Sequence, residues 1–139
     1  IERAKTKNYP CPVHTLKKWT DTDYDTALET CIKNISRISV CAGTHNENST
    51  QFLANLMKEN GLNKNDNRIY FSQLLGMSDH ISYNLSAANY NVSKYVPYGP
   101  VKDVMPYLVR RAEENTSIAG QMGRELINII EEKKRRKNA

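Results

Sequence analysis

The sequence predicts an α/β fold with a parallel sheet. Three β-branched or aromatic runs alternate with amphipathic segments about ten residues long or longer, and glycines mark most of the junctions. Strands separated by helices of that length pair in parallel through right-handed crossovers. The 139 residues suffice for one modest core, but a complete (β/α)8 barrel needs roughly 200 residues or more. Because an open three-stranded sheet leaves two edges uncovered, the pattern indicates that further strands are missing.

The N-terminal segment differs from the rest of the chain. Residues 1–22 have no clean hydrophobic period and contain two prolines, which favours a loop or the end of a preceding element. Thr22 or Asp23 is the expected cap of a first helix, whose apolar residues recur at intervals of three and four. We therefore expect the main domain to extend over residues 23–139.

The remaining elements follow in a regular order. Runs rich in β-branched and aromatic residues predict strands over 35–42, 68–75 and 92–96. Helical spacing of apolar residues predicts helices over 48–60, 78–88, 101–115 and 121–134. Gly61 is the expected C-terminal stop of the first of these four helices.

The net charge of +5 is unevenly placed, since a basic cluster occupies residues 133–137. Cations at a helix C-terminus interact favourably with the helix dipole, so a solvated helix end is the ordinary interpretation. A contact with an anionic membrane or a nucleic acid is the alternative. No aromatic residues are interleaved with these cations, so the sequence predicts no nucleic-acid partner.

The cysteines and the chain start give further expectations. Three cysteines without a Cys-x-x-Cys pair fit a reducing compartment better than a disulfide framework. Cys11 and His14 have the spacing of metal ligands, but no second pair follows, so we expect no metal site. No apolar run reaches the 18 or so residues of a membrane span. The chain begins at Ile1 without a signal or transit-like segment, so we expect that this is not a native start.

Chemistry in α/β proteins gathers where strands end. The first strand is followed by Thr44, His45 and Asn46, which offer a hydroxyl, an imidazole and an amide to phosphate, ribityl or ring oxygens. A helix cap with an incidental histidine is the alternative. Leu74 and Tyr95 lie near the ends of the next two strands, as pocket residues or as ordinary packed side chains.

The helix expected over 101–115 carries four polar or charged residues on roughly one face. Tyr107, Arg110, Arg111 and Glu114 fall at i, i+3, i+4 and i+7. Two neighbouring guanidinium groups suit a small carboxylate, because each donates paired hydrogen bonds. A solvated charged face is the alternative. The sequence lacks the G-x-G-x-x-G, P-loop, G-x-S-x-G and H-E-x-x-H motifs.

Four segments in fixed order carry a family resemblance. They are Thr-His-Asn at 44–46, Tyr-Phe-Ser-Gln-Leu-Leu-Gly-Met-Ser-Asp at 70–79, Lys-Tyr-Val-Pro-Tyr-Gly-Pro-Val at 94–101 and Tyr-Leu-Val-Arg-Arg-Ala-Glu-Glu-Asn at 107–115. In these segments the chain resembles proline dehydrogenase, a family of mitochondrial flavoenzymes that oxidise L-proline. The resemblance implies the C-terminal part, about strands six to eight with their flanking helices, of a distorted (βα)8 barrel that binds FAD.

The resemblance also implies roles for individual residues. Arg110 and Arg111 would bind the carboxylate of proline, and Tyr95, Tyr107 and Leu74 would shape the pocket around its ring. The residues leave open whether proline or hydroxyproline is the substrate.

The resemblance likewise implies that Thr44, His45 and Asn46 contact FAD and that Glu114 belongs to the cofactor or arginine network. The reaction would yield Δ1-pyrroline-5-carboxylate and pass electrons to quinone. The resemblance further implies a mitochondrial location, and it allows a peripheral contact of the protein with the inner membrane. The family's other flavin contacts come from earlier strands that have no counterpart here, so we expect the chain alone to be inactive. A non-catalytic remnant or interaction module that assembles with another chain is the alternative.

Overall fold

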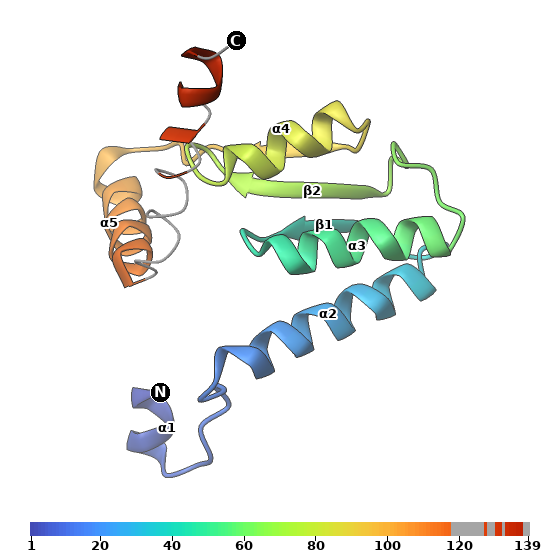
Figure 1. Cartoon of the computed structure of the whole chain (residues 1–139). Helices are drawn as coiled ribbons and strands as arrows, with labels where there is room; N and C mark the ends of the chain where they lie inside the picture. The colour runs from blue at the N-terminus through green and yellow to red at the C-terminus, as the bar shows by residue number, and fades with distance from the viewer. Residues whose placement is uncertain (118–126, 128–129, 132, 138–139) are drawn as a thin grey trace. The chain divides into compact units, whose positions relative to one another are not determined.

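The computed structural model describes residues 1–117, 127, 130–131 and 133–137, in two compact units, Ile1–Val96 and Pro97–Ala139. In the first unit the helices are α1 (Glu2–Lys7), α2 (Lys17–Lys33), α3 (Glu47–Glu59) and α4 (Asp79–Ala87). Its strands are β1 (Val40–Gly43), β2 (Ile69–Leu74) and β3 (Val92–Tyr95), and helix α5 (Val101–Ser117) belongs to the second unit (Figure 1).

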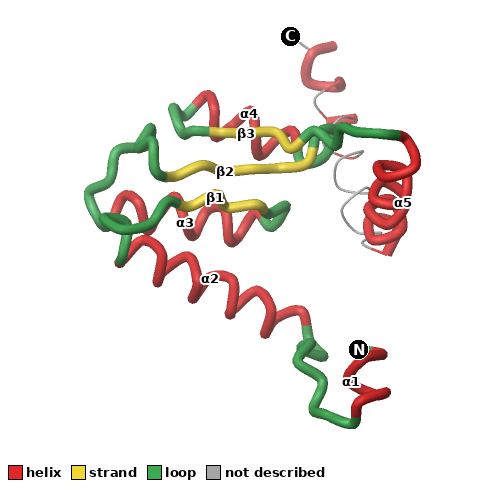
Figure 2. Tube along the Cα trace, turned by 180° about the vertical axis from the view of Figure 1, so that it is seen from behind, coloured by secondary structure: helices red, strands yellow, loops and turns green. Residues whose placement is uncertain are grey.

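The first unit is built on a parallel sheet with the strand order β1-β2-β3. Helices α3 and α4 cover one face of the sheet, and the view from behind shows the strands in front of these helices (Figures 1 and 2). Within residues 1–96, these two helices therefore leave the opposite face of the sheet uncovered. The predicted α/β class and parallel pairing are therefore confirmed.

Side chains on β2 alternate between the two faces. Ile69, Phe71 and Gln73 are buried on the side that faces the helices, whereas Tyr70 is exposed on the other side. Burying apolar side chains from both the sheet and the helices supplies the main favourable free energy of folding. The core of this unit consists of Leu28, Ile32, Val40, Ala42, Leu53, Ala54, Leu56, Met57, Ile69, Phe71, Ile81 and Leu85.

Of the two interpretations of residues 1–22, the loop is wrong where α1 and the start of α2 lie, whereas the end of a preceding element stays a prediction. Helix α2 begins at Lys17, whose ammonium group binds the carboxylate of Asp21 one turn later, 2.6 Å away. The Thr22 hydroxyl donates to the Lys18 carbonyl. The ion pair of Lys17 and Asp21 stabilises a helical turn that precedes the cap indicated by the apolar pattern.

The strand predicted over 35–42 is shorter and begins at Val40. Helix α2 ends in a turn that uses the intervening residues. The Asn34 side chain donates to the Thr30 carbonyl, and the Arg37 N–H donates to the Asn34 carbonyl. Since these groups are already bonded within the turn, residues 35–39 do not pair with β2.

In the second unit, helix α5 begins after Pro100, whose carbonyl accepts from the Asp103 and Val104 N–H groups. Pro106 is the sixth residue of this helix, so it lies in the interior and removes one hydrogen bond of the helical series. Most of the helix predicted over 121–134 lies outside the described residues, and those that are described there are helical. No described helix is long and apolar enough to cross a membrane.

Candidate functional site

The loop after β1 contains the predicted cofactor residues Thr44, His45 and Asn46, which are all half-buried. The Thr44 N–H donates to the Ser72 carbonyl at 3.2 Å, which attaches the loop to β2. The Thr44 hydroxyl oxygen accepts from the Asn46 N–H at 3.0 Å. The loop is therefore held in one conformation by hydrogen bonds to itself and to the sheet.

Asn46 ends this loop and is the N-cap of α3. Its side-chain oxygen accepts from the Asn48 N–H at 3.0 Å, and its carbonyl accepts from the Thr50 N–H. The positive end of a helix dipole and side-chain donors suit the phosphate, ribityl and carbonyl oxygens of a flavin nucleotide. Gly43 leaves open space within 4 Å of where a Cβ would stand. The chemistry of these residues thus fits part of an FAD site.

Leu74 and Tyr95 lie side by side. They are register partners on β2 and β3, and the Leu75 N–H donates to the Tyr95 carbonyl at 3.0 Å. Both stand on the sheet face opposite to the buried Phe71 and Gln73, and Tyr95 is 53% exposed. The structure brings these two predicted pocket residues together at the carboxyl edge of the sheet, where residues 44–46 also lie.

The remaining pocket residues belong to helix α5 of the second unit. The guanidinium carbon of Arg111 lies 5.3 Å from the centre of the Tyr107 ring. The two residues are one helical turn apart on α5. Their cation–π contact orients the guanidinium group of Arg111. Arg110 is exposed. Glu114 is part of α5, but its side chain lies outside what the structure describes.

Two serines and a glutamine at the first unit's carboxyl edge were not predicted as site residues. Gln73 is 2% exposed and bonds both the residue 44–46 loop and Ser82 of α4. The Ser78 hydroxyl lies 3.0 Å from Nδ1 of His45. One signal in the sequence could have identified Gln73, since it continues the core-facing series of Ile69 and Phe71 with a polar side chain.

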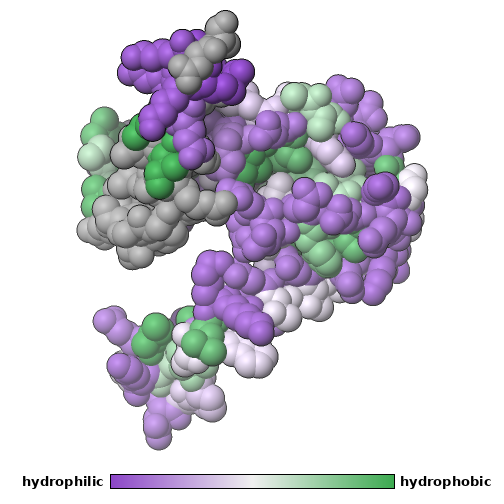
Figure 3. All heavy atoms as spheres, viewed as in Figure 1, coloured by the Kyte–Doolittle hydropathy of each residue, from purple (hydrophilic) through white to green (hydrophobic). Residues whose placement is uncertain are grey.

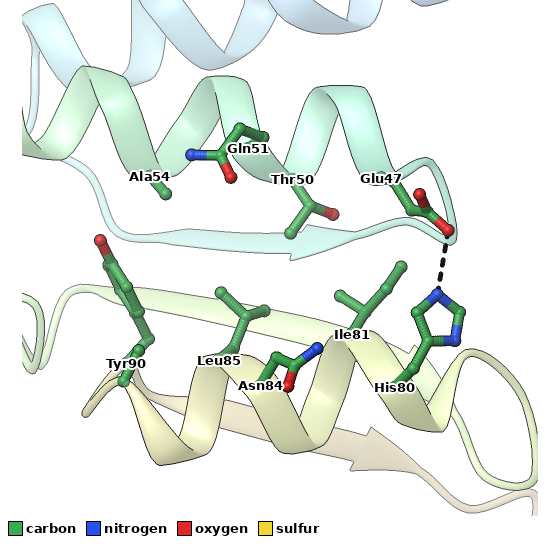
Figure 4. Close-up of a pocket in the computed structure, with 10 residues that line it drawn as sticks. Glu47, Thr50, Gln51, Ala54, His80, Ile81, Asn84, Leu85 and Tyr90 are labelled. Atoms are coloured by element: carbon green, nitrogen blue, oxygen red, sulfur yellow. Dashed lines mark hydrogen bonds and ion pairs between the residues drawn. The ribbon is translucent and has the colours of Figure 1, made fainter. Parts of the chain in front are cut away.

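A groove of about 330 Å³ lies between α3 and α4 on the helix-covered side of the sheet. Figure 4 shows Glu47 and His80 bonded at one end, at 3.0 Å, and Tyr90 at the other. Hydrophobic surface is visible between the hydrophilic outer sides of the two helices (Figure 3). None of the predicted site residues lines this groove, so it is distinct from the carboxyl edge of the sheet.

Comparison with known proteins identifies the family of the chain. The family model described as proline dehydrogenase matches residues 1–124. The mitochondrial proline dehydrogenase 1 of Drosophila melanogaster is 37% identical over 145 residues, covering 97% of this chain and 21% of the relative. The hydroxyproline dehydrogenase of Xenopus laevis is 36% identical, covering 96% of this chain and 29% of the relative.

A solved structure shares the fold as well. The crystal structure of proline utilization A from Bdellovibrio bacteriovorus, inactivated by N-propargylglycine, superposes with a TM-score of 0.75 at 28% identity. The match covers 82% of this chain and 12% of that protein. This chain therefore spans about a fifth to a third of the length of the curated relatives, and less of the solved structure. With a family model matching most of its length and relatives more than 35% identical, the chain belongs to the proline dehydrogenase family.

Proposed function

We propose that this chain supplies the substrate-carboxylate site and part of the FAD site of a proline-oxidising enzyme. The observation that carries this proposal is the pairing of Leu74 with Tyr95 on the uncovered face of the sheet, at the same edge as Thr44, His45 and Asn46. Family membership supplies the reaction class. Hydroxyproline remains an alternative substrate, because one relative is named for it.

The proposal includes a position in the fold. In a (βα)8 barrel the helices lie outside, and the opposite face of the sheet lines the interior near the active site. The three parallel strands with helices on one face fit strands six to eight of a distorted barrel. The uncovered face, with Leu74 and Tyr95, would then point inward.

The residues of α5 would bind and orient the substrate. Arg110 and Arg111 would each donate to the carboxylate of proline, and Tyr107 would hold Arg111 in place through their ring contact. Leu74, Tyr95 and Tyr107 would surround the apolar ring and exclude water. Fixing the carboxylate at one end determines which ring carbon reaches the reacting position.

Thr44, His45 and Asn46 would hold FAD, with Glu114 in the cofactor or arginine network. FAD held by these residues would supply the two-electron oxidising chemistry that converts proline to Δ1-pyrroline-5-carboxylate. We further propose quinone as the electron acceptor. We also propose a mitochondrial location, in line with the name of the Drosophila relative.

Arginine substitutions test the carboxylate site in the active protein that contains this chain. We expect Arg111→Ala to raise the KM for proline about 10- to 150-fold, because a lost hydrogen bond to a charged group costs on the order of 1.5 to 3 kcal/mol. Arg111→Lys keeps the charge but loses the planar fork, so its KM should also rise. Steady-state kinetics over a range of proline concentrations measure both.

Lys102→Ala is the matched control, since it removes an exposed cation from the same helix. An unchanged KM in both Arg111 variants, or an equal rise in the Lys102 variant, would contradict the carboxylate assignment.

The chain by itself tests the alternative of an interaction module. We expect the isolated chain to lose FAD on desalting, because the flavin contacts of the other strands are absent, and to retain it once a polypeptide supplying those strands is added. If FAD is lost in both preparations, the interaction-module interpretation is favoured instead.

A further inference from the structure

Gln73 is a polar residue where the fold calls for an apolar one. It follows Ile69 and Phe71 on the helix-facing side of β2, and it is 2% exposed. A buried amide without hydrogen bonds costs free energy that a leucine at the same place would not. The hydrogen-bond partners of Gln73 should therefore explain why a glutamine occupies this position.

Both ends of the Gln73 amide have partners. Oε1 accepts from the Ser82 hydroxyl of α4 at 2.8 Å, and Nε2 donates to the Thr44 carbonyl at 3.4 Å. The Thr44 carbonyl can only accept, so the NH2 group must face it, and this fixes the orientation of the amide. Gln73 thus connects the loop after β1 to the helix after β2.

A second connection returns to the same loop. The Ser82 N–H donates to the Ser78 carbonyl at 3.3 Å, and the Ser78 hydroxyl is 3.0 Å from Nδ1 of His45. Ser78 and Ser82 are both buried. The hydrogen bonds run from Thr44 through Gln73, Ser82 and Ser78 to His45, so the series begins and ends in the loop.

We propose that Gln73 is a positioning residue that fixes the backbone of residues 44–46 and thereby sets the groups offered to FAD. The cofactor role of the loop rests on the function proposed above, whereas the fixing of the loop does not. A side chain that served only packing would need no donor directed at Thr44.

Amide hydrogen exchange on the full chain tests this proposal without requiring flavin. The Thr44 and Asn46 N–H groups are both hydrogen-bonded, so their exchange reports on the loop. In Gln73→Met, which keeps the length but removes both bonds, we expect these two amides to exchange about three to ten times faster than in the wild type. Amides in the core of α3, such as that of Leu53, should change less.

Asn91→Ala is the matched control, because it removes a polar connection at the opposite edge of the sheet. The Asn91 side chain donates to the carbonyls of Asp66 and Ile69 at 2.7 and 3.1 Å. This variant should leave the exchange ratio of Thr44 to Leu53 unchanged. If Gln73→Met does not fold, Ser82→Ala carries the same test, since it removes the hydrogen bond that Oε1 of Gln73 accepts.

The proposal is overturned if loop and core amides accelerate equally, or if the Asn91 variant accelerates the loop as much. Binding of FAD, followed by flavin fluorescence, gives a separate readout. Where the wild type binds FAD, the Kd should rise about three- to tenfold in Gln73→Met. Absence of FAD binding by the wild type, even with the polypeptide that supplies the other strands, would count against the proposed function alone, because the exchange result stands independently.

Discussion

At the scale of residues, the amino edge of the sheet is held by Asp66 and Arg68. Nε of Arg68 donates to Oδ1 of Asp66 at 2.9 Å, and Nη2 donates to Oδ2 at 2.5 Å. The Arg68 N–H donates to the same carboxylate, and Nη1 reaches the Ile35 carbonyl. The pair therefore joins the start of β2 to the turn that follows α2.

This pair makes stability depend on pH. Hydrogen bonds from the Arg68 side chain and backbone lower the pKa of Asp66 from 3.8 to about 2. A lowered pKa stabilises the folded state fully above the unfolded value and less as pH falls toward the folded value. We expect Asp66→Asn to lower the urea midpoint at neutral pH and to flatten its decline between about pH 4 and pH 2.

Equilibrium urea unfolding over that pH range measures the effect. Asp103→Asn, which removes an exposed carboxylate from α5, controls for net charge. A decline of the same steepness in Asp66→Asn and the wild type would show that the pair does not stabilise the fold.

The site residues show what a sequence can and cannot predict at this scale. The placement of Leu74 and Tyr95 near strand ends was predictable, because strand ends follow from the pattern of apolar residues and glycines. The role of Gln73 was not, since its partners Thr44 and Ser82 lie 29 and 9 residues away along the chain. Long-range hydrogen bonds leave no local pattern in the sequence.

At the scale of elements, α3 was predicted to within a residue because several signals agree. Apolar residues recur with helical spacing, Asn46 caps the start, and Gly61 follows the end with φ +64°. The first strand was predicted too long, because its β-branched residues compete with the end of α2. Local hydrogen bonds of Asn34 decided that competition.

Gly61 provides a stability prediction for this element. A side chain in the left-handed conformation costs roughly 1 kcal/mol, so Gly61→Ala should destabilise the first unit by about that amount. Gly43→Ala is the control, since no atom lies within 4 Å of the added Cβ and no positive φ is required there. In urea unfolding, Gly61→Ala should have a lower midpoint than the wild type, whereas Gly43→Ala should not. Equal losses in both variants would contradict the conformational explanation.

At the scale of the whole molecule, the parallel order β1-β2-β3 and the position of α3 and α4 on one face of the sheet agree with the fold class predicted from alternation. The division of the pocket residues between the units Ile1–Val96 and Pro97–Ala139 was not predictable from local pattern. Leu74 and Tyr95 belong to the first unit, and Tyr107, Arg110 and Arg111 to the second.

The most direct test of the central claim is an NMR titration with FAD of the isotope-labelled chain, mixed with the unlabelled polypeptide that supplies the other strands. At about 1 mM FAD, binding free energies of about 4 kcal/mol or more are detectable. We predict that the amide signals of Thr44, His45 and Asn46 shift, while those of Gln51 and Asn84 in the groove between α3 and α4 stay in place. Shifts confined to the groove, or unmoved signals at residues 44–46, would contradict the assignment of this loop to the cofactor site.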